Sequence, residues 1–146
     1  MAPFKFRLER VLEWRRTQLQ LEEDNFRKQH AILAGLDRQY AELEAAGTQA
    51  EQVVRAWNPV AAGDLEALGS FRLHIKAREM ETAVPRNEAR RRLAAQHAVM
   101  LEARRRVRLL EKLKERSLAE WRSGRDKELE DMASESYLAG WARRRP

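Results

Sequence analysis

Apolar side chains recur every seven residues over most of this 146-residue chain. A period of 3.5 residues that continues over several repeats is typical of α-helices that wrap around a partner helix. In the first half of the chain the repeat is formed by Leu12, Leu19, Phe26, Leu33, Tyr40 and Val54. In the second half the apolar positions at this spacing are Leu68, Ile75, Ala89, Leu93, Met100, Ala103, Val107 and Leu110, and a shifted line continues through Leu113, Trp121 and Met132. The pattern predicts an all-α fold of long helices.

Residues that break helices are scarce, and they cluster at residues 58–63, where an Asn-Pro pair is followed by Gly63. Such a cluster is typical of a loop, and Asp64 is a suitable N-cap for the helix that follows. The sequence therefore predicts helices over residues 4–57 and 64–140. Pro85 lies inside the second helix and is expected to kink or locally break it.

A connection of six residues between two helices favours an antiparallel hairpin. If the chain folds back at residues 58–63, residue i lies opposite residue 122 minus i. Leu33 then meets Ala89, and Leu12 meets Leu110. We therefore expect one coiled-coil domain over residues 1–146, in which about the last 20 residues of the second helix extend past the first helix.

Composition excludes several classes of function. The chain has no cysteine, so it holds neither a disulfide nor a thiol redox site. His30, His74 and His97 are scattered and lack the spacing of a helical zinc site. No phosphate-binding loop or catalytic triad is recognisable, and a two-helix rod has no concave pocket in which to exclude water from a reaction. We expect no enzymatic activity, no cofactor and no small-molecule substrate.

Positive charge is concentrated in one segment. The chain carries a net charge of +6, yet residues 86–125 alone contain 13 Lys or Arg and 5 acids. In the hairpin this segment lies beside residues 4–35. Clustered basic residues suit an acidic protein partner, the phosphates of a nucleic acid, or a face that only keeps the rod in solution. The chain shows no long apolar run and no signal peptide, so we expect it in the cytosol.

Three segments resemble one family. Phe4-Lys5-Phe6-Arg7-Leu8-Glu9-Arg10-Val11-Leu12-Glu13 resembles the start of FliJ-type flagellar export proteins. Leu109-Leu110-Glu111-Lys112-Leu113-Lys114-Glu115-Arg116, with Trp121-Arg122 after it, and Lys127-Glu128-Leu129-Glu130-Asp131-Met132-Ala133 are similar to later parts of that family. The resemblance covers nearly the whole chain.

The resemblance implies a part in flagellum biogenesis, and hence in cell motility and chemotaxis. Members of the family are antiparallel coiled coils, similar in shape to the central stalk of rotary ATPases, in the type III export apparatus. Their end that carries both termini is thought to enter the hexameric ring of the export ATPase. They also bind the cytoplasmic domain of the membrane export gate and help to recycle export chaperones. The implied location is the cytoplasmic face of the inner membrane, as a peripheral component.

The resemblance also assigns residues. The basic segment would face the ATPase ring through Arg104, Arg105, Arg106, Arg108, Lys112 and Arg116. The positions that match the gate-binding surface are Gln29, Leu33, Leu36, Tyr40, Phe71, Ile75, Arg78 and Thr82. Arg78 and Thr82 depart from the small residue and the histidine expected there. Leu33, Leu36, Tyr40 and Ile75 also lie on the apolar seam, where they would simply form the core. Phe71 lies off the seam and is the best candidate for an exposed anchor.

Two other interpretations remain open. One is the equivalent stalk of a virulence injectisome, which shares the predicted fold. The other is a basic helical protein that binds nucleic acid, for which Phe71 and the N-terminal motif would have no role.

Overall fold

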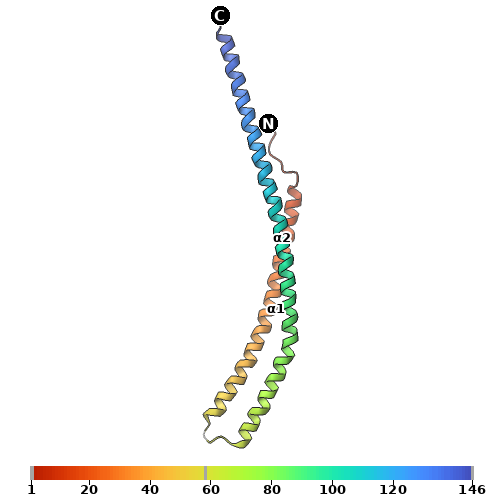
Figure 1. The fold of residues 1–146 in the computed structure, drawn as a ribbon, viewed down its shortest axis with the longest axis vertical. Coiled ribbons are helices and arrows are strands. Elements are labelled where there is room, and N and C mark those ends of the chain that lie inside the picture. Colours follow the sequence, from red (N-terminus) through yellow and green to blue (C-terminus); the bar gives the residue numbers. More distant parts are fainter. Residues whose placement is uncertain (1, 58, 146) are drawn as a thin grey trace. The chain divides into compact units, whose positions relative to one another are not determined.

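In a computed structural model, which describes residues 2–57 and 59–145, two long helices make up most of the chain (Figure 1). Helix α1 spans Glu9–Ala56 and helix α2 spans Ala62–Arg144. They pack against each other as a helical hairpin, and no strand occurs in the described residues. The prediction of an all-α fold of two long, antiparallel helices is confirmed. Asn58, in the predicted loop, lies outside the described residues.

The chain divides into two compact units. One, here called the loop unit, is Leu21–Leu101. The other, here called the terminal unit, is Met1–Gln20 together with Glu102–Pro146.

The loop unit contains the end of α1, the connection and the first half of α2. Its buried side chains are Val54, Ile75, Ala89 and Met100, all of which lie on the predicted apolar seam. The other seam positions are mostly half-buried, because two helices alone cannot enclose a side chain on every side. The seven-residue repeat therefore identified the contact surface between the helices correctly.

Contacts across the loop unit match the predicted register. A Cβ atom on Gly47 would lie 3.6 Å from the Cγ2 atom of Ile75, the residue predicted to lie opposite it. Asp37 and Arg86 form an ion pair at 3.0 Å, where the register places residue 85 opposite Asp37. Glu51 likewise pairs with Arg72, one residue from the expected position.

The connection also shows how α2 begins. The helix starts at Ala62, two residues before the predicted start. Asp64 lies within its first turn, and the Asp64 carboxylate accepts a hydrogen bond from the backbone N–H of Ala61 at 3.3 Å. An acidic side chain in the third helical position commonly reaches back to the N-cap N–H in this way. Asp64 therefore supports the helix start without being its N-cap residue.

Pro85 lies inside α2, and the helix continues through it. Since proline has no N–H, it cannot donate a hydrogen bond to the carbonyl of the preceding turn. The structure thus shows that Pro85 does not end the helix.

The terminal unit contains the start of α1 and the second half of α2. Leu12, on α1, is fully buried, and Val107, on α2, is also buried. Ion pairs connect Arg16 with Glu111 at 3.3 Å and Glu9 with Lys114 at 2.8 Å. After Trp121, α2 extends past the N-terminal segment, as predicted, and residues 125–139 are all exposed (Figure 1). The helix ends at Arg144, four residues after the predicted end.

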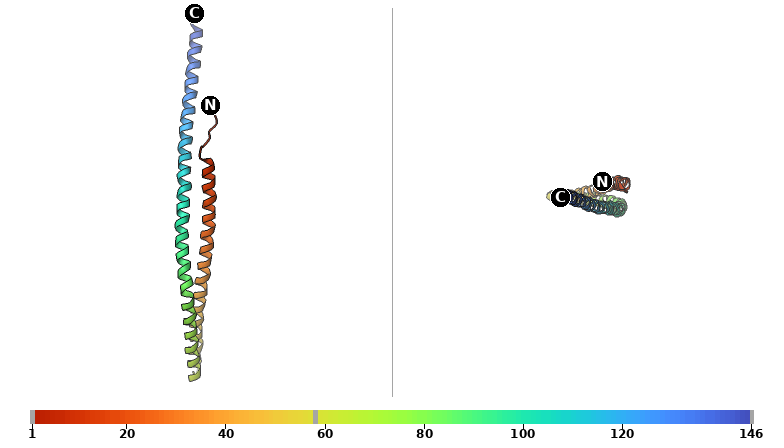
Figure 2. Two further views of the ribbon diagram at one scale, coloured as in Figure 1. Left: turned by 90° about the vertical axis from the view of Figure 1, so that its right-hand side faces the viewer. Right: turned by 90° about the horizontal axis from the view of Figure 1, so that it is seen from above.

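The first helix begins at Glu9, whereas the sequence predicts a start at residue 4. Residues 2–6 are not helical and run along α2 (Figure 2). We call this segment the N-terminal strap. The side chains of Phe4 and Phe6 are half-buried, whereas Lys5 between them is exposed, which is the alternation of an extended segment. The strap therefore buries two aromatic rings that a helix would point in different directions.

Candidate protein-binding surfaces

The six basic residues predicted to face an ATPase lie on α2 in the terminal unit, and all are exposed. Some of these six side chains form ion pairs with acidic residues, and others do not. Glu102 forms ion pairs with Arg105 at 3.7 Å and with Arg106 at 3.3 Å. Arg108, Lys112 and Arg116 form no ion pair with any described residue, and their spacing of four residues places them along one side of the helix. These three residues are called the basic row below.

The basic row lies on the outer side of α2. Val107 points into the contact with α1, and the ion pairs of Glu111 and Lys114 also reach α1. One side of α2 therefore holds the helix against α1, and the other side of the same turns leaves the basic row open to a partner. The sequence predicts that this segment presents positive charge to a partner, and the exposure of the six basic residues is consistent with that prediction.

Two leucines beside the basic row are exposed, although sequence reasoning did not assign them to a site. Leu109 is 52% exposed and Leu113 is 43% exposed. The shifted apolar line predicted Leu113, Trp121 and Met132 in the seam. Trp121 is half-buried, but the prediction is wrong for Leu113 and Met132, which are exposed, and Lys114 and Ser117 are half-buried instead of Leu113. A partner could cover the two leucines and pair its acidic groups with the basic row in one contact. The exposure of Leu109 could have been predicted from the sequence, because Leu109 does not lie on the apolar seam.

The residues predicted to bind an export gate lie in the loop unit, and their exposure differs. Phe71 is 37% exposed and Arg78 is exposed, so both are accessible to a partner. Ile75 is only 8% exposed and packs toward Gly47, so it belongs to the helix–helix core. The remaining five, which are half-buried, are Gln29, Leu33, Leu36, Tyr40 and Thr82.

The register separates these residues into two sets. The ring of Tyr40 lies 4.1 Å from the guanidinium carbon of Arg86, and Gly47 faces Ile75. The candidates on α1, between residues 29 and 40, therefore face the part of α2 from Thr82 onward. Phe71 and Arg78, on α2, face residues of α1 that come after Tyr40. By this register, Tyr40 lies opposite Thr82. The predicted gate-binding residues form an extended strip, and no single compact patch.

One ion pair of the loop unit changes the pKa of its carboxyl group. The hydrogen bond from the Arg72 guanidinium, helped by the charge of Arg55, lowers the pKa of the Glu51 carboxyl below its usual value. This pairing favours the ionised form of Glu51. It ties α1 to α2 close to the connection, beside the predicted anchor Phe71.

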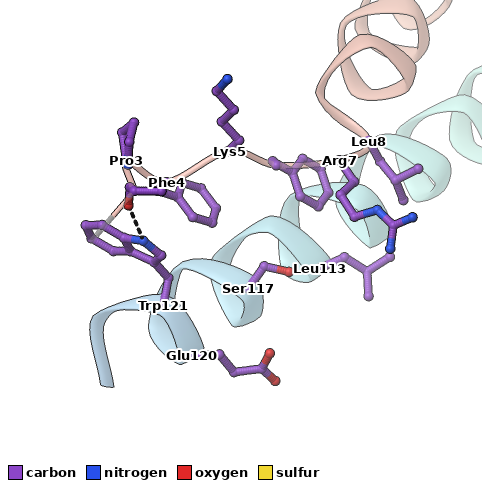
Figure 3. A pocket seen from close by; sticks show the side chains of 11 residues that line it. Pro3, Phe4, Lys5, Arg7, Leu8, Leu113, Ser117, Glu120 and Trp121 are labelled. Carbon is purple, nitrogen blue, oxygen red and sulfur yellow. Dashed lines mark hydrogen bonds between the residues drawn. The ribbon is translucent and has the colours of Figure 1, made fainter. Parts of the chain in front are cut away.

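The N-terminal strap forms a further surface, which the sequence did not predict (Figure 3). The indole N–H of Trp121 donates a hydrogen bond to the carbonyl oxygen of Ala2 at 3.2 Å. The ring of Phe4 lies 6.0 Å from the ring of Trp121, in a tilted arrangement typical of aromatic pairs. Strap and helix line an open groove with Leu8, Leu113 and Ser117. The sequence from Phe4 to Leu8 could have indicated this segment, because its alternation of apolar and basic residues fits an extended conformation as well as a helix.

The described residues offer little to metal chemistry or membrane insertion. No group of three or more His, Asp or Glu side chains among them could hold a metal ion. Neither helix has, within its described residues, an apolar stretch long enough to cross a lipid bilayer. Comparison with known proteins found no match: no family model, no curated protein and no solved structure is similar to this chain.

Proposed function

We propose that the chain is a non-enzymatic stalk and adaptor of flagellar type III protein export. In this role it binds the hexameric export ATPase and the cytoplasmic domain of the membrane export gate, and it assists the delivery of substrates by export chaperones. It works in the cytoplasm, peripherally at the inner membrane. The proposal rests on the resemblance of three segments to FliJ-type proteins and is supported by the helical hairpin.

The observation that carries the proposal furthest is the basic row beside exposed Leu109. Arg108, Lys112 and Arg116 have no partner charge among the described residues, so an acidic surface could pair with them without displacing existing ion pairs. The leucine supplies apolar area that can be removed from water in the same contact. Because the basic row and Leu109 lie on one helix, their positions relative to each other are fixed.

The direct test is co-purification with the cognate export ATPase, with ring assembly as a second measurement. The variant R108E/K112E/R116E reverses the basic row, and we expect its affinity to fall at least tenfold, because three attractive contacts become repulsive. A matched control is K28E/R38E/K76E, which makes the same change in charge at exposed residues of the loop unit. Unchanged affinity of the first variant, or equal loss in the control, would contradict the proposal.

Gate binding is tested separately with the soluble cytoplasmic domain of the gate protein. We expect Phe71→Ala to weaken that complex about tenfold, since an exposed aromatic anchor commonly contributes more than 1 kcal/mol. Leu73→Ala is the control, because Leu73 is even more exposed than Phe71 and lies two residues away. If both substitutions have the same effect, Phe71 is no anchor.

The same variants distinguish the rival functions. An injectisome stalk would bind the ATPase of that system in preference to the flagellar enzyme. A nucleic-acid-binding protein would bind duplex DNA with an affinity that falls steeply with salt. It would lose that affinity when the basic row is reversed and keep it in Phe71→Ala.

A further inference from the structure

Charge changes sign abruptly near the end of α2. Residues 126–135 contain five acids and one lysine, whereas residues 136–145 contain three arginines and no acid. We call residues 136–145 the C-terminal tip. Arginines also offset the negative end of the helix dipole, which accounts for their charge. That effect does not account for the apolar side chains that accompany them.

Three large side chains of the C-terminal tip are exposed. Tyr137 is 73% exposed, Leu138 60% and Trp141 48%. Residues four apart lie above one another on a helix, so Tyr137 and Trp141 share a side with Leu138 adjacent. The guanidinium of Arg145 lies 4.2 Å from the Trp141 ring, which places a positive charge on the same side. The tip thus combines aromatic, aliphatic and basic groups on one surface.

We propose that the C-terminal tip binds the surface of an anionic lipid bilayer. Tryptophan and tyrosine have apolar rings with polar edges, and they are enriched at the level of lipid headgroups. Arginines pair with lipid phosphates, and each basic residue near an anionic bilayer strengthens binding about fivefold. Stable attachment to a bilayer requires both apolar burial and basic charge, and the tip supplies both.

The neighbouring acids determine how the tip meets the bilayer. Asp126 and Glu130 are exposed, and their spacing of eleven and seven residues from Tyr137 places them on the side of α2 that carries Tyr137 and Trp141. An anionic surface that faced this side along its whole length would repel both carboxylates. The helix therefore contacts the bilayer with its last two or three turns only, and it does not lie along the surface. This contact goes beyond the proposed export function and does not require an ATPase or a gate.

The test is flotation of the full chain with lipid vesicles at low salt. One set of vesicles contains phosphatidylcholine alone, and the other contains phosphatidylcholine with about one third phosphatidylglycerol. We expect binding to the anionic vesicles only. R143Q/R144Q/R145Q should weaken it about a hundredfold, since three fivefold contributions multiply. L138S/W141S should weaken it at least tenfold through lost apolar burial.

Two further variants show whether the tip is responsible. K28Q/R38Q/K76Q removes three exposed charges from the loop unit, and R108Q/K112Q/R116Q removes the basic row. Both should bind anionic vesicles more tightly than the tip variants do. The proposal is overturned if the wild type does not bind anionic vesicles, if either of these variants loses as much binding as the tip variants, or if neutral vesicles bind equally well. It is also overturned if the tip variants lose binding to duplex DNA and keep binding to vesicles.

Discussion

At the residue scale, the polar side chains in the seam between α1 and α2 differ in how well they are satisfied. The amide of Gln96 donates hydrogen bonds to the backbone oxygen of Glu22 at 3.1 Å and to its carboxylate at 2.5 Å. Arg86 is held by both the Asp37 carboxylate and the Tyr40 ring. The side-chain oxygen of Gln29, in contrast, is buried and has no hydrogen-bond partner among the described residues. An unsatisfied buried acceptor reduces the stability of a fold.

Replacement of Gln29 by leucine should therefore stabilise the chain. We expect the free energy of unfolding to rise by about 1 kcal/mol, because the change removes an unsatisfied polar atom and adds apolar area to the seam. Urea denaturation followed by circular dichroism measures the change. Gln39→Leu is the control, since Gln39 is exposed and should change stability little. Equal stabilisation by both substitutions would mean that burial at Gln29 is not the cause.

Acidic pH should weaken the ion pair between Glu51 and Arg72. Because folding lowers the pKa of Glu51, its contribution to stability is present above the unfolded value of 4.5 and is lost as pH falls below it. The wild type should therefore unfold at a higher temperature than Glu51→Gln at pH 7. The difference should shrink as the pH falls below 4.5 and disappear once the pH is below the lowered pKa of the folded state. A difference that persists there would show that Glu51 acts through packing and not through its charge.

At the element scale, α2 is a long helix whose parts have very different support. Residues of the terminal unit up to Trp121 pack on α1 or on the N-terminal strap, whereas residues 125–139 are exposed throughout. An isolated helical segment of this length is only marginally stable in water. Its helical state depends on continuation from the packed part of α2.

Amide hydrogen exchange should reveal this difference within one helix. We expect the amides of residues 125–144 to exchange much faster than those near Val107, because local opening there breaks no helix–helix contact. Mass spectrometry of proteolytic peptides resolves the two regions. If vesicles or a protein partner cover this segment, exchange within it should slow. Uniform protection along α2 in the free protein would contradict the expectation.

Pro85 leaves a defect in the hydrogen bonding of α2 that a substitution can remove. Pro85→Ala restores the missing backbone N–H, and proline is about 3 kcal/mol less favourable than alanine inside a helix. We expect a gain of about 2 kcal/mol, since proline also restricts the unfolded chain. Thermal denaturation measures it. Val84→Ala, at an exposed neighbour, is the control and should change stability much less.

At the scale of the whole molecule, apolar burial is sparse. The buried apolar side chains of the described residues are Leu12, Val54, Ile75, Ala89, Met100 and Val107. A fold with so few buried side chains has little margin of stability. A partner that binds only the folded form adds stability that is large compared with such a margin when its concentration far exceeds the Kd.

Complex formation should therefore raise the unfolding temperature. With the export ATPase at a concentration 100 times the Kd, binding adds about 2.7 kcal/mol to the stability of the chain. Differential scanning fluorimetry of a labelled chain measures the shift. The variant R108E/K112E/R116E should lose the shift. A shift of the same size with an unrelated acidic protein would indicate non-specific charge pairing.

The sequence predicted the fold well and the candidate sites less well. The seven-residue repeat determines which side chains face the other helix, and the short connection determines which residue meets which, so contacts such as Gly47 with Ile75 followed directly. The start of α1 was wrong, because residues 2–6 are stabilised by Trp121, more than a hundred positions away, and local patterns hold no information on that contact. Leu113 was misassigned because the prediction followed the apolar side chain, whereas the seam keeps its spacing of three and four residues through Leu110, Lys114 and Ser117. The exposure of Phe71 was predictable, since it depends only on its distance from the seam.

The register of the loop unit also limits how the length of this chain can change. An insertion or deletion of one residue in α1 would turn every later side chain by about 100° and move apolar residues out of the contact. Only a change of seven residues, matched by seven in the facing part of α2, preserves both the facing surfaces and the pairing between them. Shorter changes are tolerated in the connection or in the exposed part of α2 after Trp121. Related chains should accordingly differ in length by paired heptads, or at these two places.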